Sequence, residues 1–267
     1  MSDFAYFDTD AFHWLGRAFH DKPLREDLRG RILLSPITFL EAITHLTLET
    51  REDLLAHFRA IRNWANPQDL HLLPWPSDAI AEFAFCTSTN DIDFPSFVEQ
   101  AINSCLISES ANKLHDPAAE LKNLLDDHKK QKAAQFRELV NLYGATADTG
   151  ADLSLAWVRA IANRAKASID ARPLSEVLSK RSAYHEYEQE RIKVAANNPS
   201  HVPDENDVFD SEQLVYLADP KLHFVTCDGG HLKRIKNSPQ LSRIHRIPIE
   251  ELRDSTRIEG LLARITS

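Results

Sequence analysis

Four carboxylates stand where short apolar runs end or where helices are expected to begin. They are Asp8 in AYFDTDAF, Glu41 in LLSPITFLEAITHL, Asp210 in NDVFDSEQLVYLAD and Asp228 in LHFVTCDGG. In an open α/β sheet, such positions converge on the crevice at the carboxyl ends of the strands. Carboxylates gathered there repel one another and take up protons unless a cation compensates their charge. Because Mg²⁺ prefers oxygen ligands, the pattern predicts a divalent-metal site.

The chemistry that such a site supports is hydrolysis of a phosphodiester. Two metal ions held by carboxylates activate a water and stabilise the leaving oxygen of an in-line displacement. We expect Asp8 and Asp228 to bind metal directly, and Glu41 and Asp210 either to bind it or to position the water. Taken singly, an Asp that follows a strand is also a common helix cap, and this alternative stays open for Asp8 and Asp228.

Other polar residues near the four acids have more than one interpretation. Asp10 either joins the metal shell or faces solvent. Asp207 is expected to cap the helix that follows it, with a metal contact as the alternative because it lies three residues before Asp210. Glu212 is expected to be a solvated helix residue. None of the twelve histidines forms an HExxH motif, and His231 is the one candidate for general acid/base chemistry.

The elements that must position these residues alternate between strand and helix at both ends of the chain. Apolar runs bounded by turn residues predict strands at residues 4–8, 31–36, 70–73, 222–226 and 243–247. Helical periodicity predicts helices at residues 11–19, 38–66, 208–218 and 231–235. From about residue 77 to 197 the periodicity is helical throughout. We therefore expect an α/β core of residues 1–85 and 200–267 and an all-helical insertion of residues 86–199.

Composition narrows the class of protein. The chain has 267 residues, 43% of them hydrophobic, which suffices for one large core or two smaller ones. No run approaches the roughly 18 apolar residues of a membrane helix, and the acidic start MSDFAYFDTD is unlike a signal peptide, so we expect no membrane association and a cytoplasmic location. The net charge of −9 argues against a protein that coats nucleic acid.

Several other classes lack their motifs. The three cysteines, Cys86, Cys105 and Cys227, show no CxxC spacing and predict buried thiols instead of a disulfide framework or a zinc site. The chain contains no GxSxG, no P-loop and no GxGxxG. Serine hydrolases, P-loop nucleotide hydrolases and dinucleotide-binding enzymes are therefore unsupported.

The four segments YFDTDAFHWL, SPITFLEAITHL, FDSEQLVYLAD and FVTCDGGHL resemble, in this order, the acidic motifs of the PIN-domain family of metal-dependent nucleases. The resemblance covers roughly residues 1–85 and 200–250. It implies a three-layer α/β/α fold with a central parallel sheet, Mg²⁺ or Mn²⁺ held by the four acids, and hydrolysis of single-stranded RNA. It also implies that the Thr226 hydroxyl supports the site. The family often has Asn or Ser where this chain has Asp10, and its usual small domain lacks so large a helical insertion.

The resemblance predicts a metal-dependent endoribonuclease, and family analogy adds a toxin-like role with an inhibitory protein partner, as in toxin–antitoxin pairs. Two rivals stay open: a catalytically silent PIN-like module that binds protein, and a structure-specific DNA nuclease of similar fold. In the insertion, Trp157 with Arg159, Arg164 and Lys166 is a candidate RNA-binding set, against the alternative of a core tryptophan beside a solvated face. Its amphipathic helices are alternatively suited to a homodimer or a docked partner.

Overall fold

A parallel sheet lies at the centre of the protein. A computed structural model describes residues 3–44, 51–64, 72–76, 78–79, 96–110, 115–146, 182–198 and 206–266. The sheet has three strands in the order β1 (Phe4–Phe7), β2 (Leu222–Thr226) and β3 (Ile244–Arg246). Phe7 pairs with Val225 and Thr226 with Arg246, both in parallel register. The predicted mixed α/β class is confirmed, and β2 has the predicted bounds.

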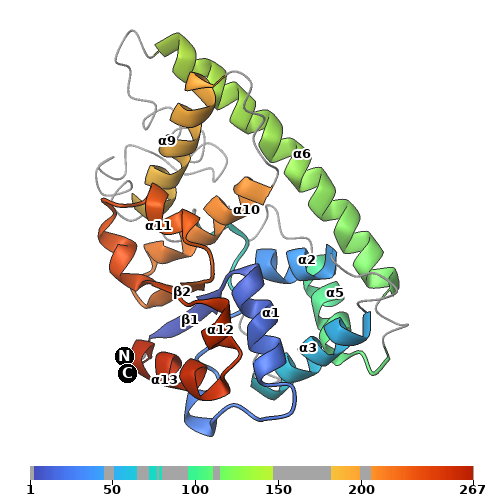
Figure 1. Ribbon diagram of the computed structural model, residues 1–267. Helices are drawn as coiled ribbons and strands as arrows, with labels where there is room; N and C mark the ends of the chain where they lie inside the picture. Colours follow the sequence, from blue (N-terminus) through green and yellow to red (C-terminus); the bar gives the residue numbers. More distant parts are fainter. Residues whose placement is uncertain are drawn as a thin grey trace.

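Helices make up most of the rest of the described chain (Figure 1). The α-helices are α1 (Thr9–Ala18), α2 (Pro36–Thr44), α3 (Arg51–Trp64), α5 (Ser96–Ile107), α6 (His115–Thr146), α9 (Ser182–Asn197), α10 (Asn206–Gln213), α11 (Gly230–Arg234), α12 (Ile249–Leu252) and α13 (Ser255–Ile265). The 3₁₀-helices are η1 (Glu26–Leu28), η5 (Leu214–Ala218) and η6 (Pro239–Arg243). None of the helices in the described ranges is long and apolar enough to span a membrane.

Single-residue parallel bridges extend the sheet beyond β1. Ala5 pairs with Ile32, and Leu34 pairs with Leu72. The strand predicted at residues 31–36 is reduced to these bridges because Pro36, which has no N–H to donate, begins α2. The segments that follow β1 in the chain, at residues 32–34 and at Leu72, therefore lie on one side of β1. Strands β2 and β3 lie on its other side. The direction of sheet building thus reverses between β1 and β2.

Helices cover both faces of the sheet because alternate side chains of each strand point to opposite sides. Phe7 and Val225 belong to an apolar core that includes residues of α1, α2, α12 and α13. Tyr6 and Phe224 belong to a second core with residues of α9 and η5. The rings of Tyr6 and Phe224 stack with centroids 5.0 Å apart. Helix α9, which the sequence placed in the insertion, therefore contributes to the apolar core on one face of the sheet.

Two predicted helices have different bounds in the structure. The stretch predicted as one helix over residues 38–66 contains α2 and α3, and residues 45–50 between them lie outside the described part. The helix predicted over residues 208–218 is α-helical only to Gln213 and continues as η5. The described parts of residues 86–199 contain α5, α6 and α9 and no strand. Trp157, Arg159, Arg164 and Lys166 lie outside the described residues.

Helix α6 is anchored on α10 by a buried carboxylate, and this corrects the prediction that Glu212 is solvated. The Glu212 side chain is only 3% exposed; Lys132 Nζ lies 2.7 Å from Oε1 and His128 Nε2 lies 3.1 Å from Oε2. Burial alone would raise the pKa of Glu212, but the charges of Lys132 and His128 outweigh it and lower this pKa to about 2. Packing of α6 against α10, which the helical period alone does not reveal, encloses this side chain.

Glu212→Gln should lower the free energy of unfolding by about 3 kcal/mol, because it leaves the Lys132 ammonium without its buried counter-charge. The stabilisation depends on the ionised carboxylate, whose pKa is depressed from its ordinary value of 4.5 to about 2. It should therefore be fully present above about pH 4.5 and decline as the pH falls toward 2. Chemical denaturation of both proteins across this pH range measures the difference.

Glu190→Gln is the matched control, because Glu190 forms an ion pair of 2.9 Å with Lys193 on an exposed surface. This substitution should change the free energy of unfolding by less than about 1 kcal/mol. Equal effects of the two substitutions would contradict the role of Glu212 as an anchor between α6 and α10.

Candidate metal centre

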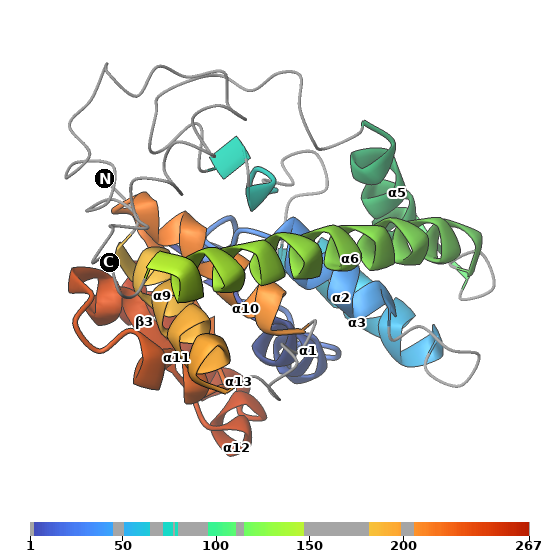
Figure 2. The same ribbon diagram turned by 90° about the horizontal axis from the view of Figure 1, so that it is seen from above.

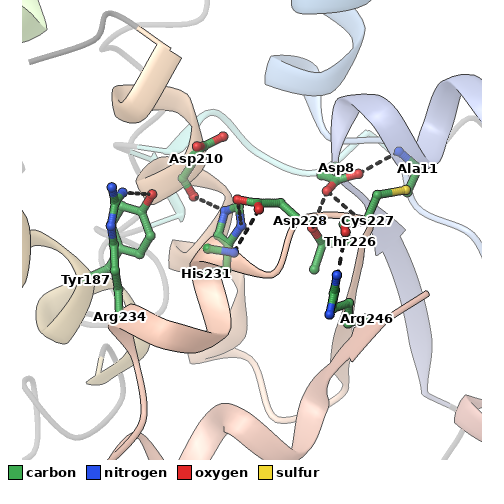
Figure 3. Close-up of polar contacts among 11 residues, drawn as sticks. Asp8, Ala11, Tyr187, Asp210, Thr226, Cys227, Asp228, His231, Arg234 and Arg246 are labelled. Atoms are coloured by element: carbon green, nitrogen blue, oxygen red, sulfur yellow. Dashed lines mark hydrogen bonds and ion pairs between the residues drawn. The ribbon is translucent and has the colours of Figure 1, made fainter. Parts of the chain in front are cut away.

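Asp8 lies at the carboxyl end of β1, at the reversal of the sheet. Its backbone N–H donates to the Val225 carbonyl oxygen at 3.0 Å, which continues the pairing of β1 with β2. As the N-cap of α1, its Oδ1 accepts a hydrogen bond from the Ala11 N–H at 2.7 Å. Its Oδ2 accepts from the Thr226 hydroxyl and from the Cys227 N–H, the latter at 3.1 Å (Figure 3). Both strand ends therefore hold this carboxylate in place.

Asp228 lies just beyond β2, beside Asp8 in the sheet. Its N–H donates to the Thr226 Oγ1 at 2.9 Å, so that one buried hydroxyl contacts both acids. The Asp228 Oδ1 accepts from the Gly230 N–H at 2.7 Å. A Cβ on Gly230 would lie only 2.7 Å from the Asp228 Oδ2, so glycine leaves the room that this carboxylate needs. The Asp228 side chain is 55% exposed and opens the site to solvent.

Glu41 and Asp210 lie inside their helices, although the sequence analysis placed each at a helix start. Glu41 is in the second half of α2, since that helix already begins at Pro36, and its Oε2 accepts a hydrogen bond from the Thr9 hydroxyl. Asp210 lies one turn into α10 and is half-buried. Both acids therefore depend on the packing of whole helices for their position.

A buried hydrogen-bond chain sets the position of these two helices against β1. The Thr38 hydroxyl donates to the Phe7 carbonyl oxygen at 2.8 Å, and the Gln213 Nε2 donates to the Thr38 Oγ1 at 2.7 Å. Thr38 lies about one turn before Glu41 in α2, and Gln213 lies about one turn after Asp210 in α10. The end of β1 and the two acid-bearing helices are thus linked through one buried hydroxyl.

The carboxylates act on one another electrostatically. Burial raises the pKa of Asp8 to about 6, although the hydrogen bonds from Thr226 and Ala11 act in the opposite direction. Burial also raises the pKa of Glu41 to about 7, opposed by its bond from Thr9 and reinforced by the negative charges of Asp210 and Asp8. Two of the four acids are therefore poorly suited to carry a negative charge without a cation nearby.

His231 is buried beside Asp228 and Asp210 (Figure 3). Its Nδ1 lies 3.4 Å from the Asp228 Oδ2, and its Nε2 lies 3.2 Å from the Asp210 carbonyl oxygen. Burial lowers the pKa of His231, but Asp228, Asp210 and Asp8 together raise it above its ordinary value. Contact with His231 in turn lowers the pKa of Asp228 to about 2. His231 therefore bridges Asp228 and the backbone of Asp210.

The remaining predicted residues are placed differently. Asp10 is exposed in the first turn of α1, and its charge contributes to the raised pKa of Asp8. The side chain of Asp207 lies outside the part of the chain that the structure describes. Lys129 of α6 was missed by the sequence analysis, although its positive charge acts to lower the pKa of Glu41. The only signal was the basic run HKKQK within an otherwise acidic stretch of the insertion.

The oxygen-rich, negatively charged set suits a hard divalent cation such as Mg²⁺ or Mn²⁺. The raised pKa values of Asp8 and Glu41 fit this, because a bound cation would remove the cost of ionising both groups. As they stand, no three His, Cys, Asp or Glu side chains of the described residues are close enough to hold a metal ion. The Asp8 carboxylate also serves as the N-cap of α1.

Without metal, Glu41→Gln should be more stable than the wild type at pH 8, and the difference should vanish toward pH 4.5. The folded protein holds the Glu41 proton up to about pH 7, whereas the ordinary pKa is 4.5, so the wild type loses stability as the pH rises between these values. The slope should approach about 1.4 kcal/mol per pH unit. Thermal and urea unfolding in EDTA measure the difference, and Mg²⁺ should reduce it.

Glu52→Gln, at an exposed position in the first turn of α3, is the control for the charge change alone. Its difference from the wild type should show no comparable pH dependence in this range. If Glu41→Gln behaved like this control, Glu41 would not be a carboxyl that resists ionisation in the fold.

The described geometry brings Asp8, Thr226 and Asp228 together at the sheet and sets Glu41 and Asp210 on the helices beside them. Comparison with protein-family models, curated proteins and solved structures gave no match. The resemblance to the PIN-domain family therefore stays a prediction that rests on the four acidic motifs.

Proposed function

We propose that the protein is a divalent-metal-dependent endoribonuclease that hydrolyses phosphodiester bonds of single-stranded RNA. The observation that carries the proposal is the position of Asp8 and Asp228 after two adjacent parallel strands, where the direction of sheet building reverses. Ligand and active sites of open α/β sheets lie at this switch point. The bridges that place Ile32, Leu34 and Leu72 on the far side of β1 support a PIN-like arrangement with helices on both faces.

The residues of the site divide the work. Asp8 and Asp228 would hold Mg²⁺ or Mn²⁺, with Glu41 and Asp210 as further ligands or as acceptors that orient the attacking water. When bound, the metal would activate this water and stabilise the leaving oxygen. Thr226 fixes the Asp8 carboxylate through its hydroxyl and orients the backbone of Asp228.

One observation favours the rival function, a catalytically silent module that binds another protein. The Asp8 carboxylate accepts three hydrogen bonds from its own fold, and Asp228 accepts one from Gly230. These are the contacts that caps make in proteins without any catalytic role. A carboxylate has about four lone-pair sites, so the three hydrogen bonds that Asp8 accepts from described residues leave about one of them for a metal. The two functions therefore differ in whether metal binds at all.

Asp8→Asn and Asp228→Asn should each reduce metal-dependent cleavage of a labelled single-stranded RNA at least about a hundredfold, because several kcal/mol of metal stabilisation is lost. Asn is as good an N-cap as Asp, so α1 should stay intact in Asp8→Asn. Cleavage is followed on denaturing gels with Mg²⁺, Mn²⁺ or EDTA, and circular dichroism checks the fold.

Asp254→Asn is the matched control, because Asp254 is the N-cap of α13 and accepts from the Thr256 N–H at 2.9 Å. It should cleave as the wild type does. No cleavage by the wild-type protein in either metal, together with unchanged thermal stability at millimolar Mg²⁺, would favour the binding module. Faster cutting of single-stranded DNA or of flap DNA than of RNA would identify the third alternative, a DNA nuclease.

A further inference from the structure

Helix α6 of the insertion lies across both helices that carry acids of the candidate site. It packs on α2, which bears Glu41, and on α10, which bears Asp210 (Figure 2). The buried Glu212 fixes the contact through His128 and Lys132, at 3.1 and 2.7 Å. Because α6 is a continuous helix here, this anchor also fixes the backbone of the residues between the two contacts.

Lys129 lies within this anchored stretch, and its ammonium group lies over an aromatic ring of α10. Its Nζ lies 5.1 Å from the centroid of the Phe209 ring, and Phe209 directly precedes Asp210. Lys129 is half-buried, and its charge also acts on Glu41. The helical insertion thus places one ammonium group beside the residue that precedes Asp210.

We infer that Lys129 binds a phosphate group of the RNA substrate and holds it against the carboxylate set, an inference that rests on the proposed endoribonuclease function. An RNA phosphate that approaches four carboxylates meets a repulsive potential, and a fixed cation at their edge reduces it. Lysine suits this task as a compact charge that donates to phosphate oxygens. The cation–π contact with Phe209 holds the ammonium beside α10.

This role has consequences of opposite sign for the two ligands of the site. The ammonium attracts RNA phosphate but repels a divalent cation. Loss of its charge should therefore weaken RNA binding while metal binding stays equal or becomes tighter. A residue that merely packs on Phe209 would change the thermal stability and neither affinity.

The test uses the full chain with Lys129→Met, which keeps the unbranched stem over Phe209 and removes the charge. Fluorescence anisotropy of a labelled single-stranded RNA, in Ca²⁺ and in EDTA, gives the affinity over a salt series, with RNA integrity checked on gels. Lys129→Met should bind about tenfold more weakly. Its plot of log affinity against log salt should be shallower by about 0.7, the value for one lost phosphate contact on a single strand.

Two further variants isolate the charge at this position. Lys129→Arg should restore the salt slope, because it keeps the cation. Lys130→Met removes the neighbouring charge, which is exposed and 3.6 Å from Asp127, and should leave the slope unchanged. Mn²⁺ titration by calorimetry should show the affinity of Lys129→Met equal to or above that of the wild type.

The outcomes separate this inference from the proposed function. A wild type that cuts RNA, together with a Lys129→Met protein of unchanged salt slope, would overturn the role of Lys129 alone. A Lys129-dependent slope in a protein that never cuts RNA would support the phosphate contact and contradict the nuclease. Equal losses of RNA affinity in Lys129→Met and Lys130→Met would show that only the overall charge of α6 matters, and would overturn the specific role of Lys129. A wild type that binds no RNA would overturn both proposals.

Discussion

The parallel pairing of β1 with β2 is the constraint on which the rest of the site depends. It joins segments 218 residues apart, so that the Thr226 hydroxyl reaches the Asp8 carboxylate. A parallel pair needs a long crossover, and here that crossover contains all the helices from α1 to η5. Because the strands end together, the acids that follow them share one edge of the sheet.

The fold meets the cost of placing acids close together in two different ways. Glu212 is fully paired with Lys132 and His128, and its depressed pKa shows that the charged form is the stable one. Asp8 and Glu41 have hydrogen bonds but too little positive charge nearby, and their pKa values rise instead. The first arrangement stabilises the contact between α6 and α10. The second makes ionisation of Asp8 and Glu41 unfavourable, and binding of a cation would remove this cost. Perturbed pKa values of this kind are common at functional sites.

The helices of the insertion belong to the core as much as to the surface. Tyr184 and Tyr187 of α9 pack in the apolar cluster against one sheet face, and α6 bridges α2 and α10. Arg234 of α11 donates to the Tyr187 hydroxyl at 2.5 Å, which joins α9 to the segment that follows Asp228 (Figure 3). Through these contacts the insertion sets the position of two of the four acids, and it contributes Lys129, whose charge acts on Glu41.

The sequence by itself determined the local elements and the kinds of residue at the site. Apolar alternation located β1, β2 and β3, and polar residues after apolar runs identified Asp8 and Asp228, because these signals lie within a few neighbouring residues. Only the tertiary structure decided which acids are buried and which cations face them. The residues next to Glu212 in the sequence are like those next to a solvated acid, and Lys129 is one of several lysines in a basic run. The surroundings of both side chains arise only when α6 packs across α2 and α10. Burial and charge pairing are set by contacts between segments far apart in the chain, and a local pattern carries no information about them.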